Sequence, residues 1–234
     1  MTELSIVVPA FNEASTVEGV IRGHADTART LVSSFEIVCC DDGSTDGTRA
    51  AIARAARDVP ELAILAHDTN RGIPATMRRL YGTACGDWVY FTPADGQVPA
   101  SALPVMWAAR EGAALVVGDR RPRRDPRSRV LVAELYSAGL RALFRLPVRD
   151  VDSVKLYRAV DLRGSAPRST TNFMEAEILI TLHRRGAVIR EVPIEHRPRI
   201  AGRARGVTLG SAVHAIVDLG LFTFADLLRG RRGR

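Results

Sequence analysis

Short apolar runs alternate with stretches of helical periodicity along the first part of the chain. The runs are rich in β-branched and aromatic residues and are bounded by proline, glycine or polar residues, which predicts buried strands. Between them, apolar residues recur every three to four positions, which predicts helices that pack through one face. The predicted strands are residues 4–9, 35–40, 62–66 and 88–91, and the predicted helices are residues 14–31, 48–57 and 75–84.

This alternation predicts an α/β fold with a doubly wound, mostly parallel sheet and right-handed crossovers. Ligands bind such sheets at the carboxyl ends of the strands. The chain has 234 residues and is 46% hydrophobic, which is enough for one full core. We expect residues 1–206 to form one domain and residues 207–234 to form a C-terminal helical appendage.

Composition narrows the class of protein. Lys155 is the only lysine among 33 basic residues, so the net charge of +7 reflects an arginine bias that we do not take as evidence for nucleic acid binding. Cys39, Cys40 and Cys85 show no CxxC spacing, which argues against a disulfide framework or a zinc site. The sequence shows neither a signal peptide nor a long uncharged apolar run. We therefore expect a cytoplasmic protein.

The loops after the first two predicted strands carry side chains suited to a nucleotide. Pro9, Phe11 and Glu13 follow the first strand, and Asp41 and Asp42 follow the second. A carboxylate at position 41 or 42 can accept hydrogen bonds from a base or ribose, and Phe11 can cover the apolar face of a base. Neither GxGxxG after the first strand nor GxxxxGK[ST] is present, so dinucleotide binding and P-loop phosphate transfer are not expected.

The fourth predicted strand ends in a turn that carries Asp95 and Gln97. A carboxylate and an amide oxygen two residues apart can both face one hard cation, which can bridge to a diphosphate. Alternatively, Asp95 is a solvated turn former.

Several segments, in this order and at these spacings, resemble family-2 glycosyltransferases. They are residues 5–13, 41–48, 70–72 and 94–97. Later segments resemble the dolichyl/polyprenyl-phosphate mannose or glucose synthase branch of that family. They are residues 117–120, 150–158 and 191–202.

The resemblance implies a GT-A (Rossmann-like) fold and inverting transfer of a hexose, of the mannose or glucose class, from a GDP- or UDP-linked sugar to polyprenyl phosphate. It assigns Asp95 and Gln97 to Mg²⁺ or Mn²⁺. Arg199 and Arg203, near a glycine, are candidates for clamping a diphosphate or the acceptor phosphate. The residues assigned to the nucleotide sugar are Pro9, Phe11, Glu13, Asp41, Asp42, Asn70, Arg199 and Arg203.

Besides Ser153-Val154, which lacks the aromatic residue of the usual Ser-Gly-Phe or Cys-Ala-Phe pattern, one departure from the family pattern affects the metal site. The usual aspartate two residues before Asp95 is Pro93 here, so one anionic ligand is lost and metal affinity should be weak. Because magnesium often uses one or two carboxylates plus phosphate oxygens, Asp95, Gln97 and the substrate remain a sufficient ligand set. The alternatives are catalysis without metal, with arginines stabilising the leaving diphosphate, and binding without turnover.

Candidate catalytic residues are Asp95, Arg120 and Glu175. Arg120 belongs to the arginine-rich stretch 118–130, which two prolines interrupt and which we predict to be a mobile loop; the resemblance places Arg120 near the acceptor phosphate. A hydroxyl acceptor would need a general base, for which Glu175 and Glu177 are candidates, although both also suit the first turn of a helix. An anionic lipid phosphate would need no base.

The C-terminal helix combines an apolar face with a basic end. It suits an interfacial helix on anionic lipid at the inner face of the membrane, or a helix packed on its own domain or on the second subunit of a homodimer. Transfer to polyprenyl phosphate is the leading hypothesis. The alternatives are transfer to a soluble acceptor, such as a sugar nucleotide or a secondary metabolite, and a non-catalytic nucleotide-sugar-binding protein.

Overall fold

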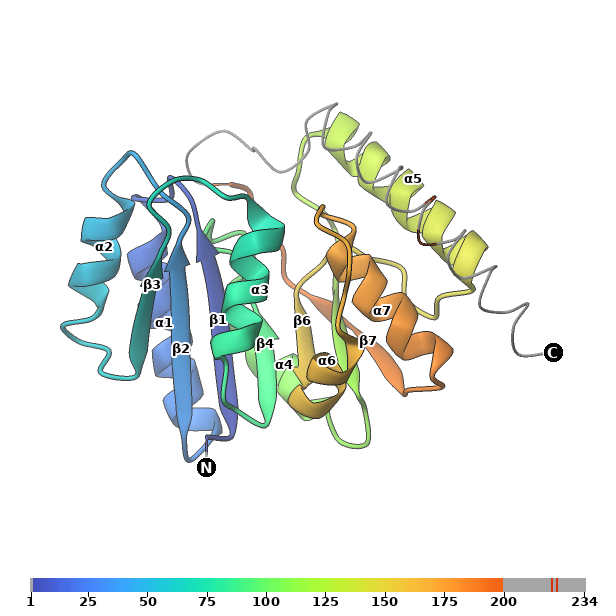
Figure 1. The fold of residues 1–234 in the computed structure, drawn as a ribbon, viewed down its shortest axis with the longest axis horizontal. Helices are drawn as coiled ribbons and strands as arrows, with labels where there is room; N and C mark the ends of the chain where they lie inside the picture. The colour runs from blue at the N-terminus through green and yellow to red at the C-terminus, as the bar shows by residue number, and fades with distance from the viewer. Residues whose placement is uncertain (1, 200–219, 221, 223–234) are drawn as a thin grey trace.

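The computed structural model describes residues 2–199, 220 and 222, which form one mixed sheet covered by helices on both faces (Figure 1). The strands are β1 (Leu4–Ala10), β2 (Phe35–Asp41), β3 (Leu62–Ala66), β4 (Trp88–Phe91), β5 (Leu115–Arg120), β6 (Lys155–Arg158) and β7 (Ile189–Ile194). The helices are α1 (Val17–Leu31), α2 (Thr48–Ala55), α3 (Ile73–Thr83), α4 (Ala102–Ala108), α5 (Arg127–Phe144), α6 (Ala159–Ser165) and α7 (Met174–Arg184).

The sheet has the order β3-β2-β1-β4-β6-β5-β7. β1 pairs in parallel with β2 and β4, β2 pairs in parallel with β3, and β5 pairs in parallel with β7. Only β6, among the strands of the described chain, runs antiparallel to its neighbours, β4 and β5. The predicted doubly wound, mostly parallel sheet is therefore confirmed. The carboxyl ends of β1, β2, β3 and β4 meet at one edge.

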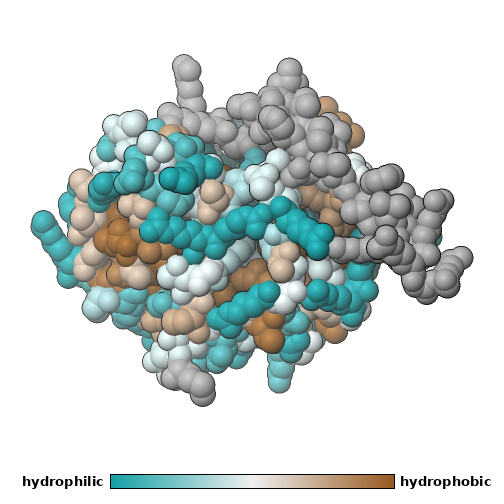
Figure 2. Space-filling view, viewed as in Figure 1, coloured by the Kyte–Doolittle hydropathy of each residue, from teal (hydrophilic) through white to brown (hydrophobic). Residues whose placement is uncertain are grey.

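Alternation along the strands divides the core into two layers. On β1, Leu4, Ile6 and Val8 join the cluster that includes residues of α1 and α4, whereas Val7 joins the cluster that includes residues of α3 and α7. Figure 1 shows α3 and α7 in front of the sheet and α1 behind it. β3 is an edge strand, and Figure 2 shows apolar residues at the surface over β2 and β3, where Ile64 is 44% exposed.

The stretch 118–130 is only partly a loop, so the prediction of a mobile loop over its whole length was wrong. β5 extends to Arg120, and α5 begins at Arg127, directly after Pro126. A proline next to the first turn of a helix does not interrupt it, because the first backbone N–H groups have no partner inside the helix. The loop is therefore confined to residues 121–126.

Two expectations concern residues that the structure does not describe. Arg203 lies outside the described residues, and so does the helix expected over residues 207–234, apart from Gly220 and Phe222. Phe222 packs edge-on against Phe144 of α5 and against Phe173, with ring centroids 6.1 and 5.7 Å away. None of the described helices combines the length and apolar character needed to cross a membrane.

Candidate functional site

The loops after β1 and β2 are tied together by hydrogen bonds at the carboxyl edge of the sheet. The backbone N–H of Asn12 donates to Ser44 Oγ at 2.9 Å, and Asn12 Oδ1 accepts the N–H of Thr45 at 2.8 Å. The N–H of Glu13 donates to Thr48 Oγ1 at 2.7 Å. Asn12 has a φ of 55°, a conformation that asparagine tolerates better than most residues. Sequence reasoning missed Asn12, and its residue type in a tight loop was the available signal.

Asp41 stands at the end of β2 and is fully buried. Its Oδ1 accepts the N–H of Ser44 at 3.0 Å, and its Oδ2 accepts Nε of Arg49 at 3.1 Å. A carboxylate has about four lone-pair positions, of which these two contacts use two, and the side chain of Asp41 is 1% exposed.

Asp42 braces the loop after β3. Its Oδ1 contacts His67 Nδ1 at 2.8 Å and accepts the N–H of Arg71 at 2.9 Å, while its Oδ2 accepts the N–H of Gly72 at 2.9 Å. Gly43, with a φ of 69°, allows this loop to approach, because an added Cβ would lie 2.4 Å from the backbone carbon of Thr69. The carboxylate of Asp42 therefore has more protein partners than that of Asp41.

Glu13, Asp95 and Arg199 come together from three distant segments of the chain. Arg199 Nη1 lies 3.2 Å from Asp95 Oδ2, and Arg199 Nη2 contacts Glu13 Oε1. Asp95 Oδ1 also accepts the N–H of Gln97 at 3.0 Å. Burial raises the pKa of the Glu13 carboxyl, and the nearby Asp95 adds to this, although Arg199 opposes both. The guanidinium of Arg199 thus bridges two carboxylates at the carboxyl edge of the sheet.

The side chain of Gln97 contacts different residues from those that the side chain of Asp95 contacts. The side-chain Nε2 of Gln97 lies 3.4 Å from both Asp125 Oδ1 and the backbone carbonyl oxygen of Arg197, and the backbone carbonyl of Gln97 accepts the N–H of Arg197 at 2.8 Å. Gln97 therefore joins the 121–126 loop to the segment after β7.

The acidic residues fit a divalent cation in part. Asp95 and Glu13 present two carboxylates to one guanidinium, and Mg²⁺ is commonly held by one or two carboxylates plus phosphate oxygens. Within the described part of the chain, no group of three or more His, Cys, Asp or Glu side chains is placed to hold a metal ion. The sequence predicted that Glu13 borders the nucleotide. In the structure it also shares Arg199 with Asp95, the predicted metal ligand.

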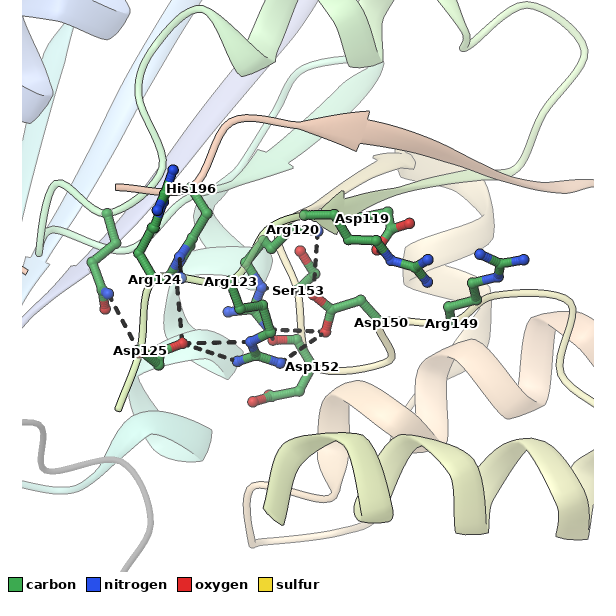
Figure 3. Close-up of polar contacts among 12 residues, drawn as sticks. Asp119, Arg120, Arg123, Arg124, Asp125, Arg149, Asp150, Asp152, Ser153 and His196 are labelled. Carbon is green, nitrogen blue, oxygen red and sulfur yellow. Dashed lines mark hydrogen bonds and ion pairs between the residues drawn. The ribbon is translucent and has the colours of Figure 1, made fainter. Parts of the chain in front are cut away.

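Arg120 is held by Asp150 (Figure 3). Arg120 Nε lies 2.7 Å from Asp150 Oδ2, and Arg120 Nη2 lies 2.9 Å from Asp150 Oδ1 and contacts the carbonyl of Asp152. Burial acts to raise the pKa of Asp150, but Arg120 outweighs it, so the pKa is lowered. The guanidinium of Arg120, predicted to face an acceptor phosphate, is therefore paired with a carboxylate of the protein itself.

The same network continues through the 121–126 loop to His196 (Figure 3). Arg123 lies between Asp125 and Asp150, at 3.4 and 3.5 Å. His196 Nδ1 accepts the N–H of Arg124 at 3.0 Å, and its Nε2 lies 3.9 Å from Asp125 Oδ2. Burial and then Arg120 lower the pKa of His196, although Asp125 opposes them. The loop is thereby anchored to the segment after β7.

A basic pocket of about 550 Å³ lies beside this network, between the end of β5 and the inner side of α5. Its arginines are Arg120, Arg121, Arg123 and Arg149. Asp119, Asp150 and Glu134 also line it, so only part of the positive charge is neutralised. The pocket is suited to an anionic group.

Glu175 lies in a buried cluster. Its Oε2 is 3.3 Å from Lys155 Nζ and accepts the hydroxyl of Tyr157 at 2.8 Å, while its Oε1 accepts the hydroxyl of Tyr81 at 2.8 Å. Lys155 is 1% exposed. Glu175 therefore has three protein partners, Lys155, Tyr157 and Tyr81, and none of them belongs to the Glu13–Asp95 cluster.

The remaining predicted residues differ in their exposure. Glu177 accepts the backbone N–H groups of Arg168 and Ser169, at 3.0 and 2.7 Å, and so supports the loop before α7. Pro9 is buried, Phe11 is half-buried and Asn70 is exposed.

Comparisons with known proteins agree with this architecture. The family model described as glycosyl transferase family 2 matches residues 5–160. Glycosyltransferase AglD of Haloferax volcanii is 24% identical over 84% of this chain and 33% of its own length. Undecaprenyl-phosphate 4-deoxy-4-formamido-L-arabinose transferase of Yersinia pestis is 30% identical over 53% of this chain and 38% of its own length. The chain thus spans a third to two fifths of the length of these curated relatives.

Solved structures share the fold. A crystal structure of glucosyl-3-phosphoglycerate synthase from Mycobacterium tuberculosis, in complex with Mn²⁺, uridine diphosphate and glucosyl-3-phosphoglycerate, superposes with a TM-score of 0.67. It is 24% identical, and the match covers 87% of this chain and 73% of that chain. The predicted GT-A fold is therefore confirmed. Because the family model covers more than half of the sequence, this chain belongs to glycosyl transferase family 2.

Proposed function

We propose that this chain is an inverting glycosyltransferase that moves a hexosyl group from a nucleoside-diphosphate sugar to polyprenyl phosphate. The observation that carries the proposal is the convergence of Glu13, Asp95 and Arg199 at the carboxyl edge of the sheet. Acidic groups that can hold a cation, next to an arginine that can hold phosphate, are what a leaving diphosphate requires. The family match and the undecaprenyl phosphate in the name of the Yersinia pestis relative support the same reaction class.

The donor would lie across the loops after β1, β2 and β4. Asp41, at the end of β2, would accept hydrogen bonds from the base or ribose, and Phe11, in the loop after β1 that is hydrogen-bonded to the loop after β2, would cover the base. Asp95 and Glu13 would hold Mg²⁺ or Mn²⁺, and Arg199 would turn from these carboxylates to the diphosphate. A bound divalent ion would supply positive charge that stabilises the leaving diphosphate. Loss of one ligand at Pro93 supports weak metal binding.

In the transfer step, an acceptor phosphate oxygen forms the new bond to the anomeric carbon as the bond from that carbon to the diphosphate oxygen breaks. The electron pair of the broken bond stays on the diphosphate, where arginine stabilises it. A phosphate oxygen is already anionic near neutral pH, so no general base is needed. The three protein partners of Glu175 support a mechanism in which its carboxylate is structural.

The basic pocket beside α5 is the proposed acceptor site. Arg121 is half exposed there, and Arg149 is exposed, so both can reach an incoming phosphate. Arg120 would contribute while remaining paired with Asp150. A soluble phosphorylated acceptor is the second candidate, because the same pocket suits any small anion, and the structural neighbour from Mycobacterium tuberculosis is described with phosphoglyceric acid.

The test is a transfer assay with radiolabelled UDP- and GDP-hexoses, with and without polyprenyl phosphate and Mn²⁺. Label that enters the organic phase only with polyprenyl phosphate supports the proposal. Label in an aqueous product favours the soluble acceptor, and donor binding without any product overturns the enzymatic proposal.

Asp95→Asn tests the site itself. Because Asp95 carries the charge next to the donor diphosphate, we expect at least a hundredfold loss of transfer activity, on the order of the losses seen when transition-state charge stabilisation is removed. Asp87→Asn is the matched control, since Asp87 is exposed at the opposite end of β4. Equal activity of the two variants would contradict the assignment of Asp95.

A further inference from the structure

The outward side of α5 is apolar along its whole length. Ser137, Leu140 and Phe144 face the protein and are buried. Successive residues of a helix advance by about 100°, so the opposite side is formed by a second set of positions, all of which are exposed. These positions are Ser128, Leu131, Val132, Leu135, Ala138, Gly139, Ala142 and Leu143. Only Ser128 among them carries a polar side-chain atom. We call this set the outer face of α5.

Exposure of this kind is concentrated on α5. Leu131, Val132, Leu135 and Leu143 are 57%, 54%, 64% and 54% exposed. The other large exposed apolar residues of the described chain are spread over several elements. They are Ile64, Ile73, Val105, Val160 and Val188. Single exposed apolar residues are normal on protein surfaces, whereas a continuous patch indicates an interaction site.

Arginines border the outer face on one flank. Arg127 in the first turn and Arg141 in the last turn are exposed and lie on the same flank of the helix, with Glu134 between them on that flank. Arg145, also exposed, follows directly after the helix. An apolar helical face with an arginine-rich border is the pattern of helices that lie in the interface of an anionic bilayer. An antiparallel symmetric pairing of α5 with a second copy would instead bring the arginine flanks of the two copies together on one side of the interface.

We infer that the outer face of α5 binds the surface of an anionic lipid bilayer. The apolar side chains enter the boundary between headgroups and acyl chains, and the arginine flank contacts anionic headgroups. Figure 1 shows α5 at the periphery of the molecule, above α7 in this view. This membrane contact differs from the one expected at residues 207–234, which lie almost wholly outside the described residues.

The position of α5 connects this surface with the acceptor. Val130, Ala133 and Ser137, on the inner side of the helix, line the basic pocket. If the proposed function holds, a lipid phosphate would enter that pocket while its chain stays in the bilayer against the outer face. This connection rests on the proposed function, whereas lipid binding by α5 does not.

The experiment is flotation of the full chain with vesicles, without nucleotide sugar or polyprenyl phosphate. One set of vesicles contains phosphatidylglycerol and phosphatidylcholine in equal parts, and the other contains phosphatidylcholine alone. The variant Leu131→Glu/Leu135→Glu is compared with Val160→Glu, a matched control because Val160 is 67% exposed on α6. Circular dichroism and thermal unfolding verify that each variant folds, and gel filtration gives its oligomeric state.

We expect the native chain to bind the anionic vesicles more tightly than the neutral ones, and added salt to weaken the binding. The double variant should lose about a hundredfold of its partition coefficient, because each buried leucine accounts for roughly tenfold. Val160→Glu should bind as the native chain does. Native protein that fails to float, or a folded double variant that floats unchanged, would overturn the inference.

Gel filtration distinguishes membrane binding from dimerisation through the outer face of α5. If the double variant converts a dimer into a monomer while the native chain binds no vesicles, the outer face of α5 binds a second copy and the inference is wrong. Failure of the proposed function would be read from the transfer assay alone, because the flotation experiment contains neither donor nor acceptor.

Discussion

Arg120 and Arg199, both predicted to bind phosphate, lie in contrasting surroundings. Arg120 makes a two-pronged contact with one carboxylate, Asp150, and a further contact with a backbone carbonyl. Arg199 instead spans two carboxylates, Glu13 and Asp95, that come from different loops. The first arrangement fixes a loop against its neighbour. The second gathers like charges that repel one another unless a cation stays between them.

This contrast indicates which of the two arginines a ligand can displace from its carboxylates. Displacing Arg120 would leave Asp150 buried without a charge partner, which is costly. Displacing Arg199 by a divalent ion keeps both carboxylates neutralised and frees a guanidinium for phosphate. We therefore expect the Arg199 cluster to respond to ligands and the Arg120 network to respond to changes in stability.

The largest loss of stability should come from the buried ion pair Lys155–Glu175. This pair shows how much free energy of unfolding a fixed charge pair of this protein can contribute. Glu175→Leu leaves the ammonium group of Lys155 buried without its carboxylate, so the free energy of unfolding should fall by about 3–5 kcal/mol. Urea unfolding followed by circular dichroism measures it.

The double variant Lys155→Met/Glu175→Leu is the control, because removing both charges should restore much of the lost stability. A single variant as stable as the native chain would show that Glu175 is not fixed by its three partners. The general-base role for which the sequence made Glu175 a candidate would then call for a kinetic test.

Asp150→Asn should have a smaller effect with a defined pH dependence. The amide keeps part of the hydrogen bonding to Arg120 but loses the charge, so we expect a loss of about 2 kcal/mol at neutral pH. The folded pKa of Asp150 is lowered from 3.8, so its stabilising contribution is present above pH 3.8 and is lost as pH falls through the folded pKa.

The stability difference between native chain and Asp150→Asn should therefore shrink in acid. Urea unfolding over a pH series measures it, with Asp26→Asn as the control because Asp26 is 74% exposed beside Arg29. A difference that stays constant with pH would contradict the charge argument for Asp150.

The smallest effect on stability should follow Arg199→Ala, which tests the exchangeable cluster. Without the guanidinium, Asp95 and Glu13 are free for a cation, so Mn²⁺ should bind more tightly in the absence of nucleotide. Donor affinity should fall about tenfold, because a charge-assisted contact to phosphate is lost. Isothermal titration calorimetry measures both affinities.

Arg197→Ala serves as the control, since Arg197 pairs with Glu195 at a site where both are 53% exposed. Weaker Mn²⁺ binding by Arg199→Ala would reverse the comparison between the two arginines. It would mean that Arg199 organises the carboxylates for the metal instead of taking its place.

The sequence predicted the first half of the fold well, because its strands form short apolar runs that stand out, most clearly in β1, which is buried on both faces. It did not predict α5, whose outward side is also apolar, so that Leu131 and Leu135 obscure the usual amphipathic period. It placed Asp41 and Asp95 in loops that do meet at one edge. It gave no sign that Asp150 would hold Arg120, because the two are thirty positions apart.

The amino-acid sequence alone determined the alternation of strands and helices, the edge of the sheet at which polar loops gather, and the glycosyltransferase-like motifs within them. Each of these follows from local periodicity and from short-range spacing. Only the tertiary structure decided which charges neutralise which, because ion pairs such as Arg199–Asp95 and Lys155–Glu175 join segments whose separation along the chain carries no information about distance. It also decided that one side of α5 stays uncovered by the described chain, since burial depends on what packs against a helix.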